Sequence, residues 1–213
     1  MRIAWVLLLA VGLSSCDRGS TPQPTPNGSG GSGGSASSAD VSDREQTRFD
    51  QERRPEKVVE ALGIGPGARV ADIGAGSGLL TVHLARAVAP DGRVIATDTN
   101  GDVLDLLAQR MKAAGLSQVV ERRVVEPDKP DLEEGAYDAI LLAEVDHLIK
   151  DPAQWLSEAV PALKPGGRIV ISNRVYHRAN TMAAAKKAGL VLKSETNPVS
   201  SHFIAVFVAG DKK

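Results

Sequence analysis

Residues 69–78 read Arg-Val-Ala-Asp-Ile-Gly-Ala-Gly-Ser-Gly, and this stretch decides the fold. The apolar run Val70–Ile73 predicts a short buried strand, and the glycines that follow predict a tight turn. An apolar segment over residues 79–88 then predicts a helix. A strand that leads through glycines into a helix lets a ligand approach bare backbone at a helix N-terminus. The stretch therefore predicts a binding site for a nucleoside ligand with a charged tail.

The spacing of the glycines separates the classes of nucleoside ligand. A dinucleotide fingerprint requires Gly-x-Gly-x-x-Gly, but the sixth position is Leu79 counted from Gly74 and Thr81 counted from Gly76. A phosphate-binding P-loop requires Gly-Lys-Ser/Thr, which does not occur in the sequence. A nicotinamide oxidoreductase therefore stays only as the weakest alternative.

Polar residues also follow three other apolar runs. The run Arg93–Asp98 ends in a carboxylate, Val119–Val125 is followed by Glu126, and Tyr137–Glu144 ends in a second carboxylate. Alternation of such runs with helices implies a parallel sheet, in which ligands bind beyond the carboxyl ends of the strands. We therefore expect four groups to line one cleft: residues 74–78, Asp98, Glu126 and Ala143–Asp146.

The glycines of residues 74–78, with Asp72 two positions ahead, resemble motif I of the class I S-adenosylmethionine-dependent methyltransferases. The Leu-Lys-Pro-Gly-Gly stretch at 163–167 resembles the turn before the fifth strand of that family. The resemblance extends from about Phe49 to Val208. It implies a doubly wound α/β fold with helices on both faces of a mostly parallel seven-stranded sheet. The implied strand order is 3-2-1-4-5-7-6, with the last strand antiparallel.

The same resemblance implies that S-adenosylmethionine (SAM) is the cofactor. The glycine turn wraps the methionine moiety and ribose in that family, and a carboxylate after the second strand, here Asp98, accepts hydrogen bonds from the ribose. Glu144 is expected to contact the methionine amino group. Asp98, Thr99 or Asn100 taken alone is also a candidate helix N-cap. The expected cofactor-binding residues are Asp72, Gly74, Ala75, Gly76, Gly78, Asp98, Thr99, Glu126, Ala143 and Glu144.

The candidate catalytic residues are His147 and Asp146. The family often carries a histidine-containing segment after the fourth strand, facing the substrate, and imidazole titrates in the range that suits a general base. The bacterial branch that this chain resembles commonly has two adjacent histidines here, and Asp146 stands at the first of those positions. The alternative is that His147 only caps a loop. Tyr176 and His177, after the fifth strand, are weaker candidates to face the substrate.

The region ahead of the glycine turn predicts a helix in two pieces over Val41–Leu62. Pro55 suits the first turn of the second piece, and Gly63 suits a C-terminal stop. The segment Phe49–Pro55 resembles a lead-in that helps to cover the ligand in one bacterial branch of the family. A plain amphipathic cap helix is an equally good interpretation of this segment.

Residues 1–15 are predicted to be a lipoprotein signal peptide. Arg2 precedes an apolar run that is too short to span a bilayer, and residues 13–16, Leu-Ser-Ser-Cys, resemble a bacterial lipobox. That resemblance implies a lipid on Cys16. Residues 16–40 are rich in Gly, Ser, Thr and Pro and predict a disordered tether that spans roughly 25–30 Å. We therefore expect a methyltransferase domain over 41–213, held at a membrane of the bacterial cell envelope. Only a wrongly assigned start would leave it in the cytoplasm.

Composition narrows the partners. The net charge is −1 and aromatic residues make up 3% of the 213 residues, which disfavours nucleic acid. The single cysteine excludes an intrachain disulfide, and no Cys/His spacing indicates a metal. We expect a monomeric SAM-dependent methyltransferase that acts on a small molecule, a lipid or a membrane-proximal protein. The alternative is a degenerate SAM- or nucleoside-binding interaction module without catalysis, because SAM is made in the cytoplasm and a lipidated domain normally faces outward.

Overall fold

The computed structural model describes residues 38–210, so the predicted signal peptide, Cys16 and almost all of the tether lie outside the described residues. Within the described range, no helix combines the length and the apolar character needed to cross a membrane. The helices are α1 Ser38–Arg53, α2 Pro55–Leu62, α3 Thr81–Val88, α4 Gly101–Ala113, α5 Pro152–Ala159 and α6 Arg178–Lys187. The strands are β1 Arg69–Ile73, β2 Arg93–Asp98, β3 Val120–Val124, β4 Tyr137–Ala143, β5 Leu163–Arg174, β6 Leu190–Val199 and β7 His202–Ala209.

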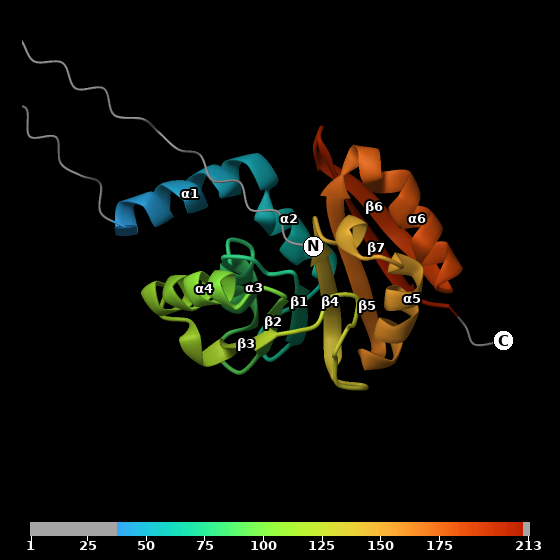
Figure 1. Ribbon diagram of the computed structural model, residues 1–213, viewed down its shortest axis with the longest axis horizontal. Coiled ribbons are helices and arrows are strands. Elements are labelled where there is room, and N and C mark those ends of the chain that lie inside the picture. Colours follow the sequence, from blue (N-terminus) through green and yellow to red (C-terminus); the bar gives the residue numbers. More distant parts are fainter. Residues whose placement is uncertain (1–37, 211–213) are drawn as a thin grey trace, which may run out of the picture. The chain divides into compact units, whose positions relative to one another are not determined.

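The strands form one seven-stranded sheet in the order β3-β2-β1-β4-β5-β7-β6 (Figure 1). The pairs from β3 to β5 are parallel, and β7 runs antiparallel to both β5 and β6. The predicted fold class and strand order are therefore confirmed. The order places β1 in the interior of the sheet, between β2 and β4, so the glycine turn follows an interior strand.

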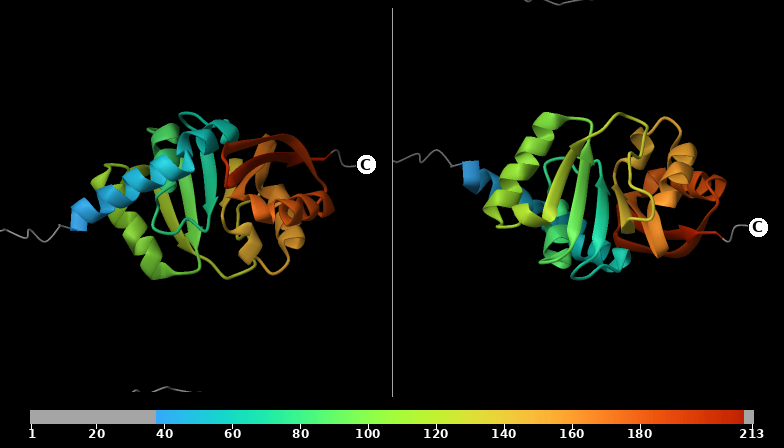
Figure 2. Two further views of the ribbon diagram at one scale, coloured as in Figure 1. Left: turned by 90° about the horizontal axis from the view of Figure 1, so that it is seen from above. Right: turned by 90° about the horizontal axis from the view of Figure 1, so that it is seen from below.

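Each face of the sheet is covered by its own helices (Figure 2). Along β4, Ala139 and Leu141 belong to a core that also includes side chains of α2, α3 and α4. The alternate residues Ile140 and Leu142 belong to a second core with side chains of α5 and α6. Successive strand residues point to opposite faces, and a strand buried on both faces must be apolar throughout. This explains the unbroken apolar run over residues 139–143 of β4.

The N-terminal helical region breaks as the sequence predicts. Arg54 separates α1 from α2 with a φ of 51°, and Pro55 occupies the first turn of α2. Buried Val58 and Leu62 attach α2 to the core. In contrast, Phe49 is the one apolar side chain of α1 from residue 43 onward that packs against the core.

Polar contacts hold α1 over the glycine turn and the start of α3. Gln46 donates from Nε2 to the Leu79 carbonyl at 3.0 Å, and Arg110 of α4 donates to Gln46 Oε1 at 3.0 Å. Asp50 contacts the His83 ring of α3 at 2.8 Å. Hydrogen bonds and charged side chains therefore hold α1 over the carboxyl end of β1.

The glycine turn has a backbone that only glycine adopts without strain. Gly74 and Gly78 have φ angles of 66° and 83°, and both lie against neighbouring side chains. A Cβ on Gly74 would come within 2.8 Å of Cγ2 of Val145, and a Cβ on Gly78 within 2.7 Å of Cγ of Leu107. Conformation and close packing therefore both select glycine at these two positions.

The Leu163–Gly167 stretch differs from its expected form. The sequence predicts a turn that precedes the fifth strand, but these residues lie inside β5. The register shifts between the pairs Tyr137–Leu163 and Ala139–Arg168, so Pro165-Gly166-Gly167 forms an irregularity within the strand. A proline and a glycine with positive φ are tolerated at such a bulge.

Replacing Gly78 is predicted to cost more stability than replacing Gly76. Both residues have positive φ, but the nearest atom to a Cβ on Gly76 would be Val103 Cγ1, at 4.0 Å. Gly76→Ala should lower the free energy of unfolding by about 1–2 kcal/mol through backbone strain alone. Gly78→Ala adds the overlap with Leu107 and should cost about 1–3 kcal/mol more. Urea denaturation of the full-length variants measures this difference, and equal losses would show that the packing of the turn on α4 is not constraining.

Candidate functional site

A cavity of about 310 Å³ lies at the carboxyl ends of β1, β2, β3 and β4. The strand order reverses between β1 and β4, and this is where open α/β sheets bind ligands. Each of the four expected groups contributes at least one lining residue. The expected residues among the lining are Gly74, Asp98, Thr99, Glu126 and Glu144. The apolar lining residues are Ile73, Val125, Pro127, Val145, Leu148, Ile149 and Trp155.

Other expected residues lie behind this lining or beside it. Asp72, Ala75, Gly76, Gly78 and Ala143 do not line the cavity. A larger hollow of about 820 Å³ lies at the opposite end of the strands, at the start of β5. None of the expected site residues lines it. The size of a hollow therefore does not locate the site, whereas the convergence of polar strand ends does.

Asp98 organises the floor of the cavity. Its Oδ2 accepts a hydrogen bond from the Gly76 N–H at 3.0 Å, and its Oδ1 accepts one from the Asn100 N–H at 3.0 Å. The N-cap of α4 is Asn100, whose side chain accepts from the Asp102 N–H. Asp98 therefore does not cap α4, and each of its oxygens has a further lone pair for a ligand hydroxyl.

Asp72 lies beneath the glycine turn and is 2% exposed. Its Oδ2 accepts a hydrogen bond from the Thr81 hydroxyl at 2.7 Å, which joins the end of β1 to the first residue of α3. Burial raises the pKa of the Asp72 carboxyl to about 6 and the charge of Asp98 adds to this, while the Thr81 hydrogen bond opposes it. At neutral pH the site thus holds a poorly compensated negative charge under the turn.

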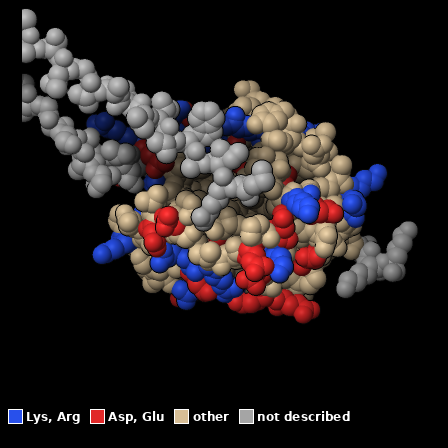
Figure 3. Space-filling view, viewed as in Figure 1, with Lys and Arg blue, Asp and Glu red and all other residues tan. Residues whose placement is uncertain are grey.

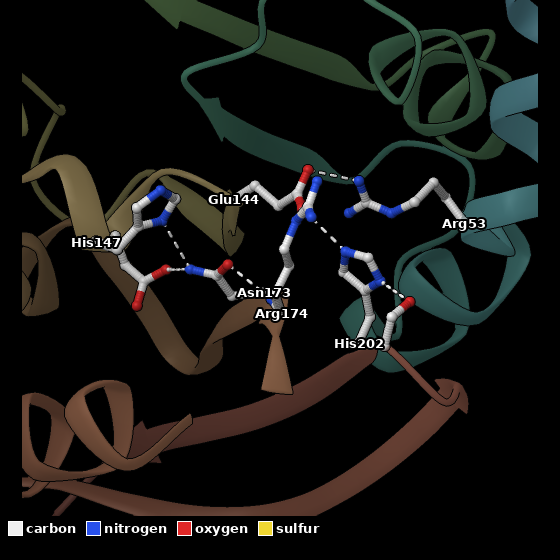
Figure 4. A network of polar contacts seen from close by, with 8 residues as sticks. Arg53, Glu144, His147, Asn173, Arg174 and His202 are labelled. Atoms are coloured by element: carbon white, nitrogen blue, oxygen red, sulfur yellow. Dashed lines mark hydrogen bonds and ion pairs between the residues drawn. The ribbon is translucent and has the colours of Figure 1, made fainter. Parts of the chain in front are cut away.

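Glu144 follows β4 and has a φ of 55°. Its Oε2 accepts from Arg53 Nη1 at 2.5 Å, and its Oε1 accepts from Arg174 Nε at 3.0 Å and from His202 Nε2 at 2.9 Å (Figure 4). Burial alone would raise the pKa of Glu144, but these donors outweigh it and hold that pKa at about 2. The carboxylate is therefore ionised, and any ligand amino group would share it with these three donors.

The two candidate catalytic residues lie at different depths. Asp146 is 4% exposed and accepts hydrogen bonds from Asn173 Nδ2 at 2.6 Å and from the Thr181 hydroxyl at 2.5 Å. His147 is exposed, and its Nδ1 lies 3.0 Å from Asn173 Nδ2. Neither Asp146 nor His147 lines the cavity, whereas Val145 and Leu148 on either side of them in the sequence do.

The polar partners of the expected residues that were not identified from the sequence include Arg53, Thr81, Asn173, Arg174, Thr181 and His202. Asn173 carries a signal that could have found it, since it ends an apolar strand in the same manner as Asp98. His202 and Thr81 carry no such signal, because their partners lie far away in the sequence or across the turn. Tyr176 and His177, the weaker candidates, form a 3₁₀ helix with Val175, and His177 stacks on His147 with ring centroids 4.1 Å apart.

On the face shown in Figure 3, basic and acidic side chains are interspersed. Among the residues with described side chains, no group of three or more His, Cys, Asp or Glu is placed to hold a metal ion.

Comparison with known proteins places this geometry in context. Residues 71–169 match the family described as methyltransferase domain. A ubiquinone/menaquinone biosynthesis C-methyltransferase from Pseudomonas putida is 29% identical over 151 residues, which covers 68% of this chain and 59% of that protein. This chain spans between 32% and 59% of the length of the curated relatives that it matches.

Solved structures show the same fold. A SAM-dependent methyltransferase from Aquifex aeolicus superposes with a TM-score of 0.71 at 21% identity, covering 81% of this chain and 98% of that one. A geranyl diphosphate C-methyltransferase from Streptomyces coelicolor, crystallised with S-adenosyl-L-homocysteine, superposes with a TM-score of 0.60 at 17% identity, covering 72% and 75%. Residues 71–169 of this chain thus match the methyltransferase-domain family, and the sheet that carries them has the Rossmann-like methyltransferase fold.

Proposed function

We propose that this protein is a SAM-dependent methyltransferase that binds the cofactor in the cavity beyond β1, β2, β3 and β4. The observation that carries the proposal is the position of Asp98, whose carboxylate lies in this cavity with acceptor capacity for two ribose hydroxyls. The match of residues 71–169 to the methyltransferase domain supports the same cofactor.

The chemistry of the lining fits SAM. Val125, Ile149 and Trp155 supply apolar surface for an adenine ring. The buried Thr97 hydroxyl also lines the cavity and has no hydrogen-bond partner among the described residues, so it suits a polar ligand atom. The negative charge of Asp72 lies below the turn, where it favours a cationic ligand over a phosphate.

Bound SAM would supply a methyl group on a positively charged sulfur, which is already a good leaving group. The residues of this chain then have to hold the cofactor, orient the methyl-accepting substrate and exclude water. Asp98 and the glycine turn perform the first task, and α1 covers the turn through its polar contacts. The methyl acceptor is proposed to be a small molecule, a lipid or a membrane-proximal protein.

Calorimetry of the full-length protein tests cofactor binding. Both SAM and S-adenosylhomocysteine should bind saturably, and Asp98→Ala should weaken both at least tenfold because it removes the ribose acceptor. Asp102→Ala, four residues along and outside the cavity lining, removes the same charge and should leave the affinity unchanged. An absence of heat at millimolar SAM would overturn the proposal, while binding without any methyl transfer would favour the degenerate binding module.

Asp72→Asn is predicted to stabilise the protein and to weaken cofactor binding. The pKa of Asp72 in the folded protein, about 6, exceeds the ordinary value of 3.8. The folded state therefore loses stability as the pH rises through this window and the buried carboxyl gives up its proton. An amide still accepts from Thr81 without the buried charge. The variant should therefore gain roughly 1–3 kcal/mol in free energy of unfolding at pH 7.5, and about 1 kcal/mol less than that at pH 5.

Urea denaturation at the two pH values and calorimetry with SAM measure both effects of Asp72→Asn. Affinity for SAM should fall severalfold because the cation loses its nearby negative charge. Exposed Asp102→Asn is the matched control and should change neither quantity. A loss of stability of the same size at both pH values would show that the buried charge of Asp72 does not destabilise the folded protein.

We propose further that Cys16 carries a lipid that holds the domain at a membrane, which rests on the sequence of residues 1–16. Cells that express the full-length protein and receive labelled palmitate should incorporate label, and Cys16→Ala should abolish it. The labelled protein should also be found in the membrane fraction of the cells. A protein that stays unlabelled and soluble would contradict the lipid anchor without affecting the cofactor proposal.

A further inference from the structure

The carboxamide of Asn173, at the carboxyl end of β5, lies between the backbone of Arg174 and the side chains of Asp146 and His147 in the loop after β4 (Figure 4). Asn173 is 0% exposed. Its Oδ1 accepts a hydrogen bond from the Arg174 N–H at 2.7 Å. Its Nδ2 lies 2.6 Å from Asp146 Oδ1 and 3.0 Å from His147 Nδ1. One amide group thus touches a backbone donor, a carboxylate and an imidazole.

The backbone contact fixes which end of the amide faces which partner. A peptide N–H only donates, so the atom facing Arg174 N must be the carbonyl oxygen of Asn173. The amide nitrogen must then face Asp146 and His147. Its two hydrogens match these two acceptors one to one, and Asp146 is held on its other oxygen by Thr181. The orientation of the carboxamide is therefore determined by its surroundings.

This orientation also determines where the proton of His147 resides. An amide nitrogen has no acceptor capacity, so Nδ1 of His147 must present its lone pair to Asn173. The proton of the neutral ring is then on Nε2. A general base would have to take up its proton at Nδ1, where Asn173 already donates, so the geometry opposes that role. Nε2–H remains available as a donor.

The rest of the ring is held in the same orientation. His177 stacks on the face of His147 with an interplanar angle of 16°, and Tyr176 packs on His177 with ring centroids 4.3 Å apart. Among the described residues, Nε2 of His147 has no hydrogen-bond partner. Leu148, the next residue in the sequence, and Tyr176, which packs on His177, are exposed by 72% and 68%. The ring thus presents one fixed N–H next to an apolar and aromatic surface.

We propose that Asn173 is a positioning residue that keeps the proton of His147 on Nε2, so that His147 donates a hydrogen bond to an oxygen of the methyl-accepting substrate instead of removing its proton. The substrate class that fits is a molecule with a carbonyl or anionic oxygen. This contact with the substrate rests on the proposed methyltransferase function, whereas the position of the proton on His147 does not.

Nitrogen-15 NMR of the imidazole rings tests the role of Asn173. The protein has four histidines, so the spectrum is simple, and His147→Gln assigns the signal of interest. In the full-length protein Nδ1 of His147 should have the shift of an unprotonated nitrogen and Nε2 that of an N–H. Asn173→Ala should mix the two tautomers, and Asn173→Asp, which offers acceptors only, should move the proton to Nδ1.

The ring of His83, which contacts Gln46 and Asp50 of α1, is the internal control and should keep its tautomer in all variants. Amide spectra establish that each variant is folded, and Asn173→Ala remains informative if Asn173→Asp does not fold. A proton on Nδ1 of His147 in the unaltered protein would overturn the proposal. An unchanged tautomer in folded Asn173→Ala and Asn173→Asp would also overturn it.

Methyl transfer from radiolabelled SAM into a lipid and small-molecule extract of bacterial cells tests the role of His147. Glutamine offers an N–H close to the place of Nε2 but is no base, so His147→Gln should retain transfer within about tenfold. His147→Ala should lose considerably more. Equal losses in both variants would overturn the donor role. An absence of transfer by the unaltered protein with SAM bound would overturn the proposed function and the substrate contact together, and the NMR result would stand.

Discussion

The hydrogen bond from Thr81 to the buried carboxylate of Asp72 joins the two sides of the glycine turn, and the site depends on it. Asp72 is in the interior strand β1, and Thr81 is the first residue of α3, so the bond closes the loop over residues 74–78. The same carboxylate keeps a charge in the protein interior, where burial raises its pKa. Desolvation of this kind opposes folding unless an opposite charge arrives. The protein thus carries a local cost at the position where a cationic ligand is proposed to bind.

Much of the fold could be predicted because local pattern and global order agree in this chain. Glycine spacing, the apolar runs and the carboxylates that end them fix the position of β1, β2 and β4, and Pro55 and Gly63 fix the ends of α2. The Leu163–Gly167 stretch was misplaced relative to its strand because Pro-Gly-Gly indicates a turn locally. Pairing with β4 on both sides of the irregularity extends β5 through these residues. Tertiary hydrogen bonding therefore outweighed local preference at this position.

The position of the candidate site could be predicted from the sequence, but only some of its contacts could. Strand ends locate Asp98 and Glu144 because topology alone brings them together. The donors to Glu144 come from α1, β5 and β7, over sequence distances that no local pattern encodes. Adjacent residues of β5 also serve different clusters, since Asn173 contacts Asp146 and His147 while Arg174 contacts Glu144. Strand alternation makes this division possible, because neighbouring side chains point to opposite faces.

The close approach of Gly74 to Val145 has an evolutionary consequence. A Cβ on Gly74 would overlap the Val145 side chain, so these two positions can change size only together, although they belong to different strand ends. Leu148, three residues further along, is 72% exposed and carries no such restriction. Descendants of this protein are thus free to diversify the outer part of the loop after β4, while its inner part stays coupled to the glycine turn. Divergence in substrate choice can then proceed without disturbing the part of the loop that contacts the glycine turn.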